Sequence, residues 1–433
     1  MTETATRIEA IELHRLDVPL VRPFETSFGR ETAREVLLVH VRTDAGEGWG
    51  ECVAGRDPFY SSEYVDQAAA VIERYLGPAL LREPVAGFTE DGHVSGVLIE
   101  DPARSAAVWV DDREQHDGYE PRHRAGGDAA ASIASVPLAA SVSSALSFVA
   151  GHRMAKGALE AAVLDAELRA QGRSMGQCFG AVRDWVDCGV SVGIAPTLEE
   201  LLDEVTGYLE QGYRRIKLKI KPGWDLVPIA AVRELIGRDG LLQVDANTAY
   251  TADDIPLLAS LDAFGLLLIE QPFAEEDIAT HVRLADACET PVCLDESILD
   301  VATAVDAIDR GATSIVNIKP GRMGGYLQAL RVHDACRALD VPVWCGGMLE
   351  TGVGRAANVA LAALPGFVLP GDTSASDRYF AEDLTEPFVL GTGEHRGQIR
   401  VPDAAGTGVT VREELVRDWA TTEPVVIPPG AAA

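Results

Sequence analysis

The sequence predicts an α/β protein whose larger domain is a (β/α)7β TIM-like barrel, with an α+β capping domain built from the N-terminal region and the C-terminal tail. Apolar runs of strand length alternate with helical patterns in the second half of the chain. These runs recur at a nearly constant period, which is typical of repeated β/α units. Most of them end in a single charged residue, and barrels of this type carry their chemistry at the carboxyl ends of the strands.

The period is most regular between Lys219 and Lys319. The apolar runs end at Lys219, Asp245, Glu270, Asp295 and Lys319, with steps of 245 − 219 = 26, 270 − 245 = 25, 295 − 270 = 25 and 319 − 295 = 24. Steps of 26 in either direction lead to Gly193, Cys345 and Gly371, which also follow apolar runs. Unbroken apolar runs are typical of parallel strands that are covered on both faces. The sequence therefore predicts eight strand ends around one barrel.

The remaining sequence is expected to form the capping domain. Residues 1–150 begin with an antiparallel meander, followed by a predicted helix at residues 62–80. Residues 84–144 are polar and then rich in alanine and serine, which predicts an exposed insertion with weak structure. The barrel is expected at residues 151–374, and residues 375–433 are expected to pack back onto the capping domain.

Composition excludes several classes of partner. The net charge of −30 would repel nucleic acid and anionic membranes. The sequence contains neither a membrane-length apolar run nor an N-terminal secretory pattern, so a cytoplasmic protein is expected. Seven scattered cysteines without a CxxC pair predict reduced thiols rather than disulfides or a zinc site. We expect a homo-oligomer that acts on a small-molecule carboxylate substrate.

Lysine is rare in this chain and is concentrated at two predicted strand ends. The five lysines are Lys156, Lys217, Lys219, Lys221 and Lys319. Strand alternation places Lys217 and Lys219 on one face, which is the barrel interior if Leu218 faces the helices. Lys319 lies four strands away in a ring of eight, so it should face Lys219. A lysine amine can exchange a proton where a guanidinium cannot, which indicates proton transfer at these positions.

Asp245, Glu270 and Asp295 end three successive predicted strands and should lie side by side. Three hard carboxylate oxygens suit Mg²⁺, with Mn²⁺ as a substitute. The alternative is that these carboxylates cap helices or pair with lysines, but three of them in register favour the metal. A metal-bound carboxylate acidifies its α-proton, which a lysine with a lowered pKa can remove. We expect Lys217 and Arg322 to lower that pKa by like-charge repulsion.

Five motifs surround these residues: Lys217-Leu218-Lys219, Val244-Asp245-Ala246-Asn247, Ile269-Glu270-Gln271-Pro272, Leu294-Asp295-Glu296-Ser297 and Asn317-Ile318-Lys319-Pro320-Gly321-Arg322. Together they resemble the enolase superfamily of the muconate-cycloisomerase type. More narrowly, they are similar to the o-succinylbenzoate synthase / N-acylamino acid (N-succinylamino acid) racemase group. The resemblance extends over nearly the whole chain except the predicted insertion.

The resemblance assigns roles to particular residues. It implies Lys219 and Lys319 as general acid/base residues on opposite faces of the substrate, with Lys217 in support. It implies Asp245, Glu270 and Asp295 as the Mg²⁺ ligands. The substrate contacts that it implies are Phe24, Tyr60, Asn247, Arg322, Gly347, Met348 and Leu349.

The implied activity is Mg²⁺-dependent syn-dehydration of 2-succinyl-6-hydroxy-2,4-cyclohexadiene-1-carboxylate to 2-succinylbenzoate through an enediolate, a step of menaquinone biosynthesis. N-succinylamino acid racemase activity is expected in the same site. The alternative is that racemisation, by two-base 1,1-proton transfer, is the physiological reaction. Arg322 matches a position associated with racemase competence in this group, and it is compatible with the synthase.

Two other functions are disfavoured. Dipeptide epimerases of the superfamily usually have an Asp-x-Asp at the eighth strand, whereas this chain has Asp372-Thr373-Ser374. A non-catalytic binding protein would have little reason to keep every polar catalytic position.

Overall fold

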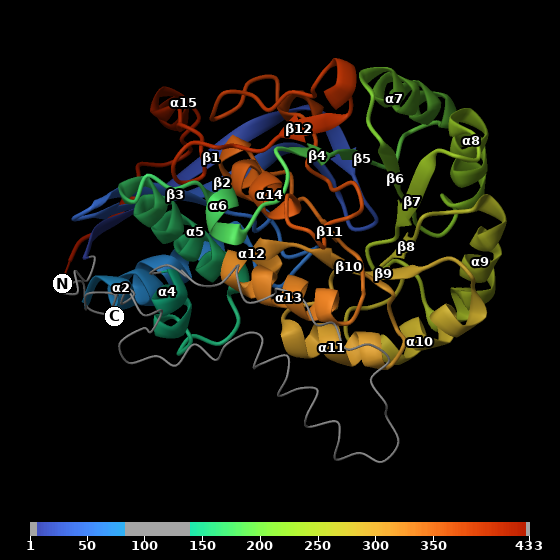
Figure 1. Ribbon diagram of the computed structural model, residues 1–433, viewed down its shortest axis with the longest axis horizontal. Helices are drawn as coiled ribbons and strands as arrows, with labels where there is room; N and C mark the ends of the chain where they lie inside the picture. Colours follow the sequence, from blue (N-terminus) through green and yellow to red (C-terminus); the bar gives the residue numbers. More distant parts are fainter. Residues whose placement is uncertain (1–6, 83–138, 430–433) are drawn as a thin grey trace, which may run out of the picture.

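The computed structural model describes residues 7–82 and 139–429 (Figure 1). Most of the predicted insertion at residues 84–144 lies outside the described residues. Its last part departs from the expectation of weak structure, because helix α4 (Ala139–Ala145) forms there. Val142 and the following Leu146 are buried in the core of the capping domain, and this burial stabilises the short helix.

The capping domain contains a four-stranded antiparallel sheet in the order β13-β1-β2-β3. Its strands are β1 (Ile8–Glu25), β2 (Arg30–Thr43), β3 (Gly46–Cys52) and β13 (Val425–Ile427). Ile427 pairs with Ile11, so the end of the tail completes the sheet that the N-terminal strands begin. Between β2 and β3 the Thr43 hydroxyl accepts a hydrogen bond from the Gly46 N–H and fixes the tight turn.

Helices cover one face of this sheet. Residues 65–82 form a continuous helical stretch of α1 (Val65–Val71), the π-helical turn η1 (Ile72–Leu76) and α2 (Gly77–Arg82). Helix α5 (Arg153–Ala170) lies against β3 at very short range. A Cβ atom added at Gly50 would be 2.1 Å from the carbonyl oxygen of Ala158. Glycine at this position therefore lets the strand and the helix backbones touch.

The second sheet is parallel and has seven strands in sequence order. They are β5 (Gly189–Val192), β6 (Arg215–Lys219), β7 (Leu241–Asp245), β8 (Ile269–Glu270), β9 (Val292–Leu294), β10 (Ile315–Ile318) and β11 (Val343–Cys345). The predicted eighth strand is an extended segment that makes only single parallel bridges, Phe367 with Val343 and Gly371 with Cys188. Pro370 has no N–H to donate, which explains why no regular strand forms there.

Helices surround this sheet on its outer side (Figure 1). They are α7 (Leu198–Gln211), α8 (Leu226–Ile236), α9 (Ile255–Ala259) between the 3₁₀ turns η3 (Ala252–Asp254) and η4 (Ser260–Phe264), α10 (Ile278–Ala287), α11 (Val301–Asp309), α12 (Pro320–Met323), α13 (Tyr326–Ala338) and α14 (Gly352–Ala362). The main core lies between the strands and these helices. A separate apolar cluster of Leu268, Cys293, Ile315 and Trp344 fills the barrel interior, and polar side chains occupy the interior next to it.

Short elements complete the fold. They are α6 (Met175–Phe179), β4 (Trp185–Asp187), η5 (Ser376–Arg378), η6 (Gly393–His395), β12 (Gln398–Arg400) and α15 (Glu413–Asp418). Strands β4 and β12 pair with each other as a separate two-stranded sheet. Within the described ranges, no helix combines the length and the apolar character needed to cross a membrane.

A buried carboxylate joins α5 to the barrel. Glu160 of α5 accepts a hydrogen bond from the backbone N–H of Leu327, 3.0 Å away, in the first turn of α13. Burial raises the pKa of Glu160 from 4.5 to about 7, against the opposing effect of the Leu327 and Tyr326 N–H groups and of Arg331. Between these two pH values the folded protein keeps a proton that the unfolded chain has lost. The contribution of Glu160 to stability therefore decreases as the pH rises from 4.5 to 7.

We expect the Glu160→Gln variant to remove this pH dependence. The free energy of unfolding of the wild type minus that of the variant should fall by roughly 3 kcal/mol between pH 4.5 and pH 8, because 2.5 pKa units correspond to that energy. Urea denaturation at several pH values measures both terms. A difference that stays constant with pH would contradict the assignment.

Candidate active site

Strand β6 supplies three basic side chains to the barrel interior. Arg215, Lys217 and Lys219 are buried and alternate with Ile216 and Leu218, which pack in the core between strands and helices. The predicted alternation is confirmed. The aliphatic residues face the helices, so the lysine amines are directed to the interior.

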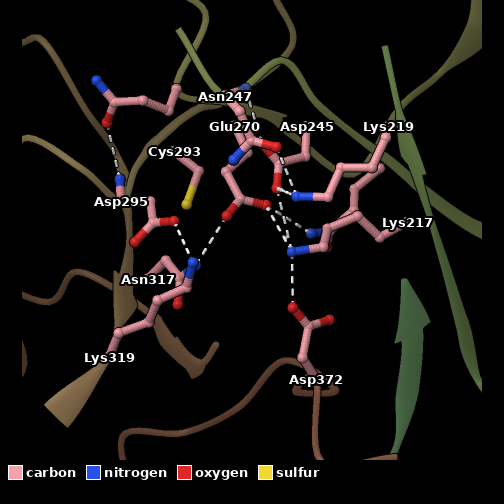
Figure 2. A network of polar contacts seen from close by, with 12 residues as sticks. Lys217, Lys219, Asp245, Asn247, Glu270, Cys293, Asp295, Asn317, Lys319 and Asp372 are labelled. Carbon is pink, nitrogen blue, oxygen red and sulfur yellow. Dashed lines mark hydrogen bonds and ion pairs between the residues drawn. The ribbon is translucent and has the colours of Figure 1, made fainter. Parts of the chain in front are cut away.

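Each of the three predicted metal ligands contacts a lysine (Figure 2). The Nζ atom of Lys219 lies 2.6 Å from Asp245 Oδ2, and that of Lys319 lies 2.6 Å from Asp295 Oδ2. Lys217 Nζ is 3.3 Å from Glu270 Oε2. Lys219 and Lys319 thus approach the three carboxylates from opposite sides, and Lys217 lies on the same side as Lys219 (Figure 2).

The three carboxylates do not share one register in the sheet. Asp245 pairs with Glu270, but Glu270 pairs with Cys293. Asp295 therefore lies two residues further along its strand than the partner of Glu270, and not in register with it as expected. Strands in a closed barrel are tilted and their register shifts around the ring, which accounts for this offset.

The donor set fits a hard divalent cation. All three ligands are carboxylates at strand ends, and Asp295 Oδ1 is buried with no hydrogen-bond partner. In this structure the ligand oxygens of Asp245, Glu270 and Asp295 do not all come within 4.8 Å of one another. The lysine amines form ion pairs with these carboxylates. This pairing is the alternative to a metal site that the sequence left open. These three residues could hold a metal if the lysine contacts loosened.

The expected lowering of the pKa of a proton-transferring lysine by Lys217 and Arg322 is wrong for Lys319. Burial lowers the pKa of the Lys319 amine, but Asp295 together with Tyr60, Glu296 and Glu270 outweighs burial and holds this pKa well above its usual value. Burial also lowers the pKa of Lys217, and there Asp372, Glu270 and Asp245 together outweigh it. Carboxylates at hydrogen-bond distance raise the pKa of a lysine amine more than the repulsion between like charges lowers it.

Asp372 is part of the site, although sequence reasoning gave it no role there. Its Oδ2 accepts from Lys217 Nζ at 2.6 Å, and its Oδ1 accepts from Arg215 at 2.9 Å. All three side chains are buried. Asp372 follows the predicted strand end at Gly371, so the periodic spacing was the signal that could have found it. Its carboxylate pairs with the side chains of Lys217 and Arg215. This pairing explains why an aspartate is found here although the chain has no Asp-x-Asp motif.

Asn317 was quoted in a motif without a role, and the structure places it in the same network. Its Nδ2 donates to Glu270 Oε1 at 2.8 Å. Asn317 lies on β10, two positions before Lys319, which directly follows the strand, so the strand alternation directs both side chains inward. The same alternation that identified Lys217 could have identified it.

A cavity of about 290 Å³ opens above the lysines. Among the predicted substrate contacts, those that line it are Phe24, Tyr60, Asn247, Gly347, Met348 and Leu349. Lys217, Lys219, Lys319 and Asp372 also line it. The cavity therefore joins loops of the capping domain to the strand ends of the barrel, and its size is close to the lower range for small-molecule sites.

Arg322 lies behind this cavity and does not line it. Its guanidinium donates to the backbone carbonyl oxygen of Asp295 at 3.0 Å and to the Tyr60 hydroxyl at 3.4 Å. The same hydroxyl is 3.1 Å from Lys319 Nζ. Arg322 thus connects the backbone at Asp295 to Tyr60 and can position both.

These features define an enzyme whose site lies at the strand ends of a barrel, under a capping domain. A family profile described as "Enolase C-terminal domain-like" matches residues 200–415. The chain belongs to the enolase superfamily. Sites of this superfamily combine a lysine or histidine base with divalent metal.

Relatives within the family carry two names. An N-succinylamino acid racemase from an Amycolatopsis species is 53% identical, over 96% of this chain and 98% of the relative. An o-succinylbenzoate synthase from Geobacillus kaustophilus is 40% identical, over 96% of each chain. A solved enolase-superfamily structure from Listeria innocua superposes with a TM-score of 0.79 at 32% identity, covering 98% of this chain and 100% of the other. The narrower group expected from the motifs is the one that these relatives represent.

Proposed function

We propose that this protein removes the α-proton of a small carboxylate substrate with Mg²⁺ as cofactor, and that one site performs two reactions. The first is the syn-dehydration that forms 2-succinylbenzoate. The second is the racemisation of N-succinyl amino acids. The observation that carries the proposal is the placement of Lys219 and Lys319 on opposite sides of the carboxylate cluster, each at 2.6 Å from a carboxylate oxygen.

In the dehydration, one lysine acts as the base and the other as a fixed cation. Lys219 Nζ takes the α-proton and returns it to the departing hydroxyl on the same face, while Asn247 Oδ1, 2.7 Å away, orients the amine. Lys319 keeps its proton and holds the negative charge that develops on the carboxylate. Asp245, Glu270 and Asp295 would hold Mg²⁺, which would supply Lewis-acid stabilisation of the same charge.

In the racemisation, both lysines exchange protons. One amine removes the α-proton from one face, and the protonated amine of the other lysine delivers a proton to the opposite face. Racemisation as the main reaction is the second candidate function, and the relative at 53% identity, which is named for racemisation, favours it.

A succinyl group would bring a second carboxylate into the cavity. Arg30 lines the same cavity from the capping domain. Arg56 also lines it, but its guanidinium is paired with Asp17 at 2.6 Å and with Glu35 at 3.4 Å. The positive charge of Arg30 supports a substrate with carboxylates at both ends, one at the lysines and one at this arginine.

Steady-state kinetics of the Mg²⁺-loaded protein would rank the two reactions. We expect measurable kcat/KM values on both the cyclohexadiene precursor and N-succinyl amino acids, with the precursor turned over more efficiently. A wide margin in favour of N-succinyl amino acids would make racemisation the function. Absence of both turnovers, together with no exchange of the substrate α-proton in deuterated water, would contradict the proposal.

A further inference from the structure

Two histidines and a glutamate meet on the face of the capping sheet that α5 does not cover. Glu12 and His14 alternate on β1, so they share a face, and Glu12 pairs directly with His40 on β2. Ile11 and Leu13, which point the other way, pack in the core with α5. This cluster is remote in sequence from the barrel lysines and takes no part in the proposed reactions.

The ligand atoms of Glu12, His14 and His40 all lie within 4.8 Å of one another, and no other such trio of His, Cys, Asp or Glu is found in residues 7–82 and 139–429. Glu12 Oε2 is 3.6 Å from His14 Nε2 and 3.8 Å from His40 Nδ1. Ligand atoms of a tetrahedral zinc site lie about 3.3 Å apart, given bonds of about 2.0 Å. Small rotations of these side chains would close the remaining gap.

The surrounding contacts leave three ligand atoms near one another. The Glu47 carboxylate, 3.2 Å from His40 Nε2, can only accept, so Nε2 carries the proton and Nδ1 of a neutral ring is an acceptor. Arg42 holds the other carboxylate oxygen of Glu12, Oε1, at 2.9 Å. His14 Nε2 is buried, faces Glu12 Oε2 at 3.6 Å and has no hydrogen-bond partner within 3.5 Å. It joins the other two atoms as a ligand when the ring carries its proton on Nδ1.

Two features of the cluster are typical of metal sites. A ligating histidine commonly donates its second N–H to a carboxylate, and Glu47 serves His40 in that way. The rings are also held in place, since His40 stacks on Trp49 at 4.1 Å between ring centroids and His14 lies 5.4 Å from the same ring.

We propose that Glu12, His14 and His40 bind one divalent transition-metal ion of the zinc class, separately from the metal of the barrel. Imidazole nitrogen favours Zn²⁺, Cu²⁺ or Ni²⁺ over Mg²⁺, whereas the all-carboxylate set in the barrel favours Mg²⁺. The positive charge of Arg42 beside Glu12 weakens the affinity. Such an ion would link β1 to β2 across the sheet and stabilise the capping domain.

The test is calorimetric titration of ZnCl₂ into the full chain after chelation and in saturating Mg²⁺, which occupies the barrel site. We expect one zinc per chain, and loss of that equivalent in the His14→Gln and His40→Gln variants. The Glu47→Gln variant should bind zinc roughly tenfold more weakly, because it loses only the partner of His40. Zinc should also raise the melting temperature of the wild type but not of the histidine variants.

The matched control is His395→Gln, because His395 stacks on Trp185 in the same way, with ring centroids 4.1 Å apart, but has no such cluster around it. This variant should bind zinc like the wild type. Far-UV circular dichroism checks that each variant folds, and the visible spectrum of the Co²⁺-loaded wild type reports histidine ligation without any substitution. Unchanged zinc stoichiometry in His14→Gln and His40→Gln, or no zinc binding by the wild type, would overturn the proposal.

Discussion

Replacing Lys319 with arginine is expected to separate the two proposed reactions. Racemisation needs an amine that gives and takes a proton on each face, and arginine cannot lose its proton, so racemisation should fall by roughly 10³-fold. Dehydration needs only a cation at this position, so its loss should be much smaller, on the order of tenfold. Parallel kcat/KM measurements on both substrates, with one preparation of each protein, would show the difference.

The Lys219→Ala variant should behave differently, because Lys219 is the base in both reactions. We expect both kcat/KM values to fall by roughly 10³-fold. Lys221→Ala is the control. Its amine lies 3.3 Å from Glu25, its side chain is 38% exposed and it lies outside the network, so both reactions should be kept. Equal losses of both reactions in Lys319→Arg would show that the proton of Lys319 is transferred in each of them.

Asp372→Asn is expected to cause the second large effect, a loss of about 3–5 kcal/mol in the free energy of unfolding. The substitution removes the negative charge between Arg215 and Lys217. It leaves the buried Arg215 guanidinium without its carboxylate partner, whereas Lys217 keeps Asp245 and Glu270 at 3.3 Å. Chemical denaturation, with the m-value checked for a two-state transition, measures the change.

A second aspartate nearby supplies the control for this prediction. Asp377 lies in η5, on the same segment, and is exposed. Asp377→Asn should change the free energy of unfolding by no more than about 0.5 kcal/mol. If Asp372→Asn were equally mild, the charges of Arg215 and Lys217 would have to be balanced by other groups, and the role given to Asp372 would be wrong.

The barrel and the inward lysines could be predicted because both depend on short-range patterns. Strand alternation decides where Lys217 and Lys219 point, and the period locates Asp245, Glu270 and Asp295. Each of these inferences uses only neighbouring positions or a constant spacing, and the parallel sheet then brings the strand ends together.

The parts that could not be predicted depend on pairings between distant residues. Asp372 gains its role from Lys217 and Arg215, whose side chains reach it only when the ring of strands is formed. The pKa of Lys319 follows from the distance to Asp295, which a sequence does not contain. The Glu12 and His40 pair depends on the register of two antiparallel strands, and a shift of one residue would have placed the side chains on opposite faces.

The missing eighth strand affects how the barrel assembles. The joint that closes the barrel between β11 and β5 is formed by a few backbone hydrogen bonds. Among them, Gly189 N–H donates to Gly371 O and Asp372 N–H donates to Cys345 O. The joint connects positions 371 − 188 = 183 residues apart, so its loop-closure entropy is large and its contacts are among the least local of the fold. We therefore expect this joint to form late in folding and to open early in local unfolding. Because Asp372 lies in it, each such opening would also take away from Lys217 one of its three carboxylate partners.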